Sequence, residues 1–69
     1  MRIKVNGEEK DIDFIDKKPL LIEALKFLGY KSNTVVVELN DLIVNSKKWG
    51  NKILKDGDSL EIVSIVGGG

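Results

Sequence analysis

The chain has 69 residues, contains neither cysteine nor histidine, and sets 11 Lys and Arg residues against 11 Asp and Glu residues, for a formal net charge of +0. A chain of this length forms one small domain, and it lacks the residues for a disulfide, for a Cys/His zinc site and for the commonest acid–base and nucleophilic catalysis. We therefore expect a protein that is not an autonomous enzyme, and the balanced, scattered charge argues against nucleic-acid binding.

The apolar runs of the chain are far shorter than the roughly 20 residues that a membrane-spanning helix needs. Residues 1–4 begin an alternating strand rather than a signal peptide. These features predict a soluble, cytoplasmic protein.

Two strands and a tight turn are predicted at the N-terminus. Residues 1–5 and residues 8–14 alternate apolar and polar side chains, and Asn6-Gly7 stands between them. Asn and Gly both accept the positive φ of a type I′ turn, so the pattern indicates an antiparallel hairpin.

A helix is predicted from Pro19 to Leu28, with Gly29 as its end. Proline is tolerated in a first helical turn because its missing N–H would have no partner there. The apolar residues recur at helical spacing and are expected to face the core, with Leu20 and Phe27 widening the stripe: Leu21, Ala24, Leu25 and Leu28.

The second half of the chain reads as three short strands joined by turns. Trp49, in a single helical turn after Asn45-Ser46, is expected to pack in the core rather than to serve a site. The expected elements are strand 34–39, turn 40–41, strand 42–44, helical turn 45–49, turn 55–58 and strand 59–66.

The resulting order, β-β-α-β-β-β, predicts an α+β protein with the β-grasp (ubiquitin-like) fold. Two hairpins separated by a helix bring the first and last strands together as parallel neighbours at the centre of the sheet. We expect a mixed sheet of four to five strands with one main helix. Residues 1–66 would form this domain, and residues 67–69 a flexible C-terminal glycine tail.

The glycine tail is the most informative feature of the sequence. Glycine has no Cβ, so a glycine tail can enter a channel that is too narrow for other residues, and three extended residues reach roughly 10 Å. The alternative is a frayed terminus or a leftover linker, which glycine-rich ends commonly are.

The last predicted strand has two different faces. Leu60 and Ile62 share the face that we assign to the core, whereas Val63 and Ile65 share the opposite face with Glu61. Because one helix covers only one face of a sheet, Val63 and Ile65 are candidate partner-binding residues. The alternative is that a covering loop buries them.

The second half of the chain carries a recognisable pattern at residues 35–40, 43–44, Trp49, 54–58, 60–63 and the terminal 66–69. With this pattern, the second half resembles the ThiS family of sulfur carriers of thiamine biosynthesis. The first half matches that family only in the order of its elements and in the Asn-Gly hairpin.

The resemblance implies a carrier chemistry at Gly69. Its C-terminal carboxylate would be adenylated with ATP by a ThiF-like adenylating enzyme and converted to a thiocarboxylate with sulfur from a cysteine desulfurase relay. Thiazole synthase would then take the sulfur to form the thiazole ring. Gly67 and Gly68 would bind within the partners, and neither a bound cofactor nor a metal is expected. Many members of the family end in two glycines. The third glycine of this chain, Gly67, departs from that pattern and would lengthen the reach of the tail.

Three other readings of the sequence remain open. The small subunit of molybdopterin synthase also ends in Gly-Gly, but it often has prolines just before these glycines, whereas Pro19 is the only proline here. A ubiquitin-type modifier would acylate lysine through the same activated carboxylate. A β-grasp binding module with an incidental tail would show no sulfur-for-oxygen exchange in its intact mass.

Overall fold

The computed structural model describes residues 1–65 of the chain. Strands and helices follow one another in the predicted order, although several of their ends differ from prediction. They are β1 (Arg2–Val5), β2 (Glu8–Asp11), α1 (Leu21–Leu28), β3 (Val35–Leu39), β4 (Leu42–Val44), the 3-10 turn η1 (Ser46–Lys48) and β5 (Ser59–Ser64).

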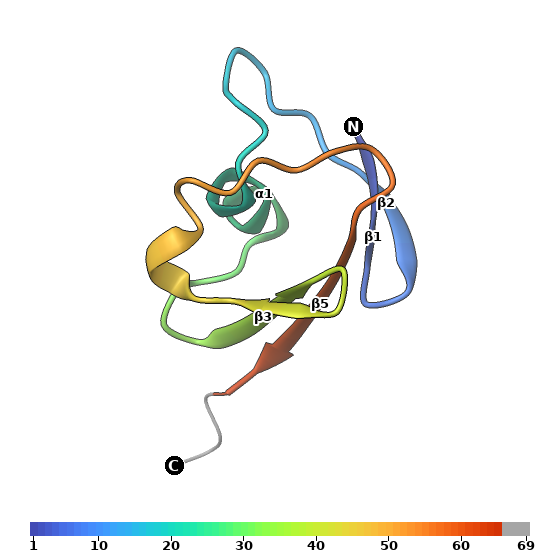
Figure 1. The fold of residues 1–69 in the computed structure, drawn as a ribbon. Coiled ribbons are helices and arrows are strands. Elements are labelled where there is room, and N and C mark those ends of the chain that lie inside the picture. Colours follow the sequence, from blue (N-terminus) through green and yellow to red (C-terminus); the bar gives the residue numbers. More distant parts are fainter. Residues whose placement is uncertain (66–69) are drawn as a thin grey trace.

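The five strands form one sheet in the order β2-β1-β5-β3-β4. The central strands β1 and β5 run parallel, and the other neighbours are antiparallel. Helix α1 lies against one face of this sheet (Figure 1). The arrangement confirms the predicted β-grasp fold, including the pairing of the first and last strands at the centre.

Both hairpins turn through two residues with positive φ. Asn6 and Gly7 have φ angles of 52° and 83°, and Asn40 and Asp41 have φ angles of 50° and 72°. Two positive φ angles define the type I′ turn, whose twist matches that of the flanking strands. The turn predicted at Asn6-Gly7 is therefore confirmed, and the turn at Asn40-Asp41 has the same form.

Asn6 also extends the central pairing beyond the end of β1. Its backbone N–H donates to the carbonyl of Leu60 at 2.8 Å. Its side-chain Oδ1 accepts from the N–H of Ile62 at 2.7 Å, and its Nδ2 donates to the carbonyl of Ile62 at 3.2 Å. The side-chain amide of Asn6 thus makes the hydrogen bonds to β5 that one further residue of β1 would make, at a point where the backbone of β1 has entered the turn.

Helix α1 begins two residues later than predicted. Leu20 is extended, with φ −88° and ψ 148°, and forms an antiparallel bridge with Ile53. The first helical N–H groups, of Leu21 and Ile22, donate to the carbonyls of Lys52 and Trp49 at 2.8 and 3.0 Å. A distant loop therefore caps the helix and holds Pro19-Leu20 outside it, which no local signal in residues 19–22 reveals.

The end of β2 and the position of Phe27 also differ from prediction. The N–H of Ile12 donates to the carbonyl of Met1 at 2.8 Å, and beyond this bond β1 has no residue left to pair with, so the strand stops before residue 14. Phe27 lies four residues after Glu23 and therefore shares its face of α1, which points away from the core. The side chain of Phe27 is accordingly 55% exposed.

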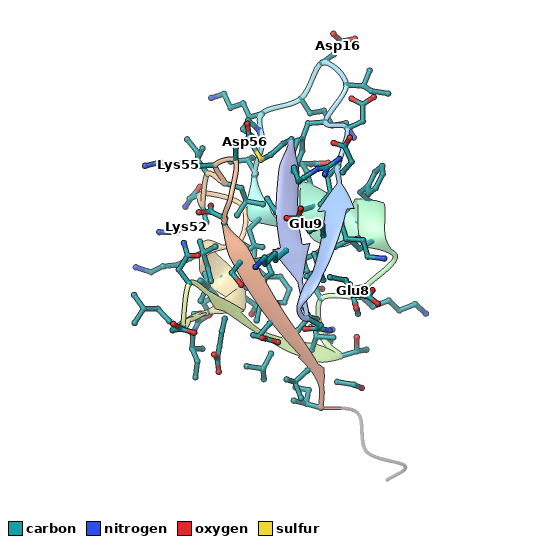
Figure 2. The ribbon with its side chains drawn as sticks, turned by 90° about the vertical axis from the view of Figure 1, so that its right-hand side faces the viewer. Glu8, Glu9, Asp16, Lys52, Lys55 and Asp56 are labelled. Carbon is teal, nitrogen blue, oxygen red and sulfur yellow. The ribbon has the colours of Figure 1, made fainter. Side chains whose placement is uncertain are left out.

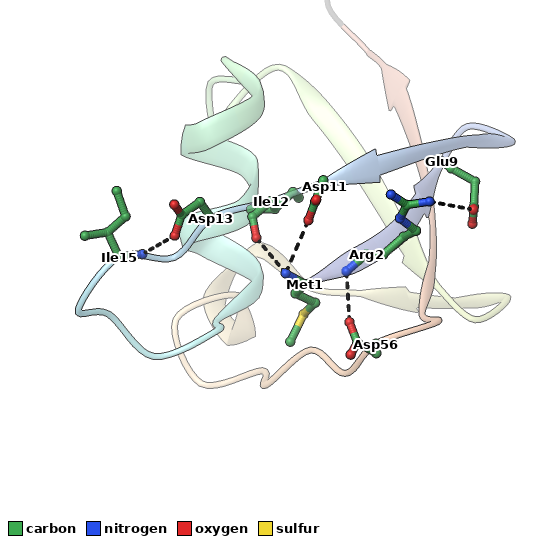
Figure 3. A network of polar contacts seen from close by, with 8 residues as sticks. All are labelled: Met1, Arg2, Glu9, Asp11, Ile12, Asp13, Ile15 and Asp56. Carbon is green, nitrogen blue, oxygen red and sulfur yellow. Dashed lines mark hydrogen bonds and ion pairs between the residues drawn. The ribbon is translucent and has the colours of Figure 1, made fainter.

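The N-terminus of β1 is held by polar contacts to the turn before β5 (Figure 3). The N–H of Arg2 donates to Oδ1 of Asp56 at 2.8 Å, and the N–H of Gly57 donates back to the carbonyl of Arg2 at 2.9 Å. The N-terminal ammonium of Met1 donates to the carbonyl of Ile12 at 3.0 Å. These bonds fix the start of β5 against the start of β1.

One core of buried apolar side chains lies between the sheet and α1. Trp49, predicted to pack, is 2% exposed, and its Nε1 donates to the carbonyl of Val44 at 2.9 Å, which satisfies its only polar atom. The buried residues are Ile3, Val5, Ile12, Leu21, Ala24, Leu25, Val35, Val37, Leu39, Trp49, Leu54, Leu60 and Ile62.

Substitution of Asn6 tests its role beside β5. We expect Asn6→Gly, which keeps the turn conformation but removes the amide, to lower the free energy of unfolding by about 1–2 kcal/mol because two hydrogen bonds to Ile62 are lost. Asn6→Ala should cost roughly 1 kcal/mol more, since alanine disfavours positive φ. Urea unfolding measures both. Stability of the Gly variant equal to that of the wild type would show that the amide contributes nothing.

Candidate functional site

Strand β5 separates the core from the solvent along its length. Leu60 and Ile62 are 0% and 6% exposed, whereas Val63 and Ile65 are 59% and 56% exposed. The assignment of the first pair to the core is therefore confirmed. No part of residues 1–65 covers Val63 and Ile65, so the covering-loop alternative is not observed there. Their role in partner binding stays a prediction.

Two further apolar residues stand beside them on the uncovered face of the sheet. Val36 of β3 is paired with Val63, and Ile43 of β4 lies at the edge of the same face, 71% exposed. A shallow hollow of about 350 Å³ at this end of the sheet is lined partly by Val36, Ile43 and Ile65 and partly by loop residues and residues that pack in the core. We call Val36, Ile43, Val63 and Ile65 the outer patch.

Sequence reasoning named only half of the outer patch. Val36 lies between two buried valines, and this alternation is a signal that it faces away from the core. Ile43 could not be placed beside β5 from the sequence, because its position depends on the register of β3 against both β4 and β5.

A pair of carboxylates lies directly beside the outer patch. Glu38 of β3 pairs in register with Glu61 of β5, and Ile43 is the neighbour of Glu38 on the other side. Side chains directly opposite one another in antiparallel strands have Cβ atoms about 5 Å apart, so two like charges here disfavour the isolated fold slightly. A cationic group of a partner would relieve this repulsion.

The predicted residues of the tail, Gly67, Gly68 and Gly69, lie outside the described residues, as does the predicted domain boundary after Val66. Their assigned roles therefore stay predictions. The last described residue, Ile65, is still bound to the sheet, since its N–H donates to the carbonyl of Thr34 at 2.8 Å. Val63 and Ile65 of the outer patch thus lie on the segment that leads into the glycines.

Within residues 1–65, no three His, Cys, Asp or Glu side chains are grouped so that they could hold a metal ion. The helices described there are too short or too polar to span a membrane.

The topology of the sheet and the one α-helix found within residues 1–65 define this chain as a ubiquitin-like β-grasp protein. Residues 3–69 match the ThiS family, and the chain belongs to that family. The family resemblance inferred from the second half of the sequence is thereby confirmed, and it extends over the first half as well.

Relatives and a solved structure agree with this assignment. The crystal structure of the thiamine biosynthesis protein ThiS from Geobacter metallireducens superposes with a TM-score of 0.80 at 30% identity and covers 100% of both chains. The uncharacterized protein ycf40 of Pyropia yezoensis is 38% identical over 97% of this chain and 90% of its own length. A thiazole synthase of Paramagnetospirillum magneticum is 39% identical over 100% of this chain, which spans only 20% of that protein.

Aspartate substitutions test the two faces of β5. We expect Val63→Asp and Ile65→Asp each to change the free energy of unfolding by less than about 1 kcal/mol, since both side chains are exposed. The matched control Ile62→Asp, on the same strand, should lower it by more than about 3 kcal/mol because it buries a carboxylate without a partner. Chemical unfolding compares the three variants, and similar losses in all of them would contradict the two-face assignment.

Proposed function

We propose that this chain is a sulfur carrier for thiazole formation in thiamine biosynthesis and that the carboxylate of Gly69 carries the sulfur. The single observation that supports this most is the exposure of Val63 and Ile65 on the segment that runs into three glycines, in a chain whose match to the ThiS family extends to Gly69. A carrier needs both features: a surface that a partner recognises and a terminus that the partner can reach.

The chemistry follows from the properties of a carboxylate. The anion is resonance-stabilised and is a poor electrophile, so it must first be activated. An oxygen of the Gly69 carboxylate attacks the α-phosphorus of ATP and displaces pyrophosphate, which gives an acyl-adenylate. The terminal sulfur of a persulfide on a cysteine desulfurase relay then attacks the acyl carbon, and AMP leaves as an acyl disulfide forms. A thiol cleaves the S–S bond by forming a disulfide with the relay cysteine, and the thiocarboxylate is released. Gly68 and Gly69 have no side chain to obstruct either attack.

The partners that this chemistry requires are a ThiF-like adenylating enzyme, the desulfurase relay and a thiazole synthase. The thiazole synthase of Paramagnetospirillum magneticum contains a region similar to this whole chain within its own polypeptide. Covalent linkage keeps two modules at a high effective concentration, as expected where one passes a group to the other. This relationship supports thiazole synthase as the acceptor of the sulfur.

The outer patch and its carboxylates suggest the surface that these partners present. Apolar groups would cover Val63 and Ile65, and arginine or lysine near Glu38 and Glu61 would neutralise the carboxylate pair. Because the free protein bears the repulsion of that pair, part of the binding energy comes from its relief.

Removal of Gly68 and Gly69 tests the role of the terminus. We expect the truncated protein to keep its melting temperature, since the described core ends before these residues, and to lose ATP–pyrophosphate exchange with the ThiF-like enzyme. Intact mass after coexpression with the enzymes should show the sulfur-for-oxygen replacement in the full chain alone. Normal exchange by the truncated protein would refute a reaction at Gly69.

Substitution in the outer patch tests recognition separately from chemistry. We expect Val63→Asp to weaken binding to the ThiF-like enzyme by about tenfold or more, because a desolvated apolar contact is replaced by a third carboxylate. Ile15→Asp is the matched control, since Ile15 is 69% exposed but lies in the loop before α1. Calorimetric titration of folded variants measures the affinities, and equal weakening by both would show that position does not matter.

A further inference from the structure

The two edges of the sheet differ in chemistry. Strand β2 forms one edge and consists of four exposed charged residues, Glu8–Asp11. Strand β4 forms the other edge, and its Leu42 and Ile43 are 72% and 71% exposed. Charges protect an edge against pairing with another strand, whereas an exposed apolar edge invites it. Only the β4 edge is therefore suited to accept a further strand.

The backbone of β4 offers the hydrogen-bonding groups for such a pairing. In a hairpin with a two-residue turn the pair next to the turn is hydrogen-bonded, so Leu42 and Val44 direct their N–H and C=O groups toward β3. The N–H and C=O of Ile43 consequently point toward the open edge. A hollow of about 460 Å³ lies beside them, lined by apolar side chains of β4 and by Lys48 and Lys52.

The segment that follows β4 is rich in lysine, whereas Asp41 precedes β4 and Glu38 of β3 is the neighbour of Ile43. Residues 42–55 contain Lys47, Lys48, Lys52 and Lys55 and no acidic residue, whereas residues 8–16 contain five acidic residues and one lysine. Figure 2 shows Lys52 and Lys55 projecting on the side of the molecule away from Glu8. The four lysines are exposed, and none of them takes part in an ion pair within residues 1–65. The zero net charge of the chain thus conceals an acidic segment at residues 8–16 and a lysine-rich segment at residues 42–55.

From these features we propose that the β4 edge binds an extended segment of a partner protein in which acidic and apolar side chains alternate. The segment adds to the sheet as a sixth strand and exchanges backbone hydrogen bonds with Ile43. Leu42 and Ile43 point to opposite faces of the sheet, so the apolar side chains of the segment cover Ile43 on the outer face, and its carboxylates, on the face of Leu42, reach Lys48 and Lys52. This surface is distinct from the terminus of the carrier and does not depend on the proposed sulfur chemistry.

Charge and the coverage of apolar side chains favour this partner over two other possible occupants of the β4 edge. A second copy that pairs β4 with β4 would bring the lysines of both copies together, and one that offers β2 would provide no apolar side chain to cover Leu42 and Ile43. A nucleic acid would match the lysines but would leave the edge groups of Ile43 and the apolar hollow without partners. An acidic–apolar strand can pair with the backbone groups of Ile43, cover the Ile43 side chain and bring carboxylates to the lysines.

The test uses the full chain, labelled for NMR, and a capped octapeptide that alternates Glu and Val. We expect the peptide to shift the amide signals of residues 42–45 and to slow hydrogen exchange at the N–H of Ile43. Lys48→Glu combined with Lys52→Glu should weaken binding by about tenfold. The matched control, Lys10→Glu with Lys26→Glu, makes the same change in net charge on β2 and α1 and should leave the affinity unchanged.

Two further peptides distinguish strand pairing from electrostatic attraction alone. A peptide with proline in place of a central valine should bind poorly, because proline has no N–H to donate. A peptide that alternates Lys and Val should not bind. The proposal is overturned if both charge reversals weaken peptide binding equally, or if the amide shifts map to residues 13–27 or 63–65. It is also overturned if a DNA oligonucleotide binds more tightly than the peptide, or if the free chain dimerises through β4.

Discussion

Strand β5 is hydrogen-bonded on both sides while only one of its faces is covered, and the rest of the structure depends on this arrangement. β1 and Asn6 hold one edge of the strand, and β3 holds the other. Since α1 is the only α-helix among the described residues, it can cover one face of the sheet but not the second. Val63 and Ile65 are therefore kept in water by the same bonds that bury Leu60 and Ile62. Such a surface is already ordered before a partner arrives, so binding need not order it.

The stability of so small a domain rests on residues that join parts of the chain far apart in sequence. A chain of this size buries only about 60% of the surface of its unfolded state, and this one has no cysteine for a disulfide. Asn6 connects the first turn to β5, Asp56 connects the last turn to β1, and Lys52 caps α1 through its carbonyl. Each is polar and stands in a turn or loop, and each satisfies backbone groups that would otherwise lack partners.

The sequence predicts those features of the fold and the site that depend on neighbouring residues. The type I′ turn at Asn6-Gly7, the alternation that buries Leu60 and Ile62 and the packing of Trp49 were all predictable. The delayed start of α1 was not, because the carbonyls that cap it come from about 30 residues later in the chain. Nor was the pairing of Glu38 with Glu61, which requires the register between two strands joined by a long connection.

A carrier must also leave each partner, which sets a limit on how tightly its surfaces bind. There is one outer patch and one Gly69, so in the proposed function the adenylating enzyme and the thiazole synthase must use them in turn. An affinity high enough for lasting capture by one would slow transfer to the next. The cost of the Glu38–Glu61 pair in the free state favours a partner that brings a cation, yet the energy involved is small enough for release. A contact at the β4 edge, which shares only Ile43 with the outer patch, would add selectivity for one partner with little effect on the contact at the rest of the patch.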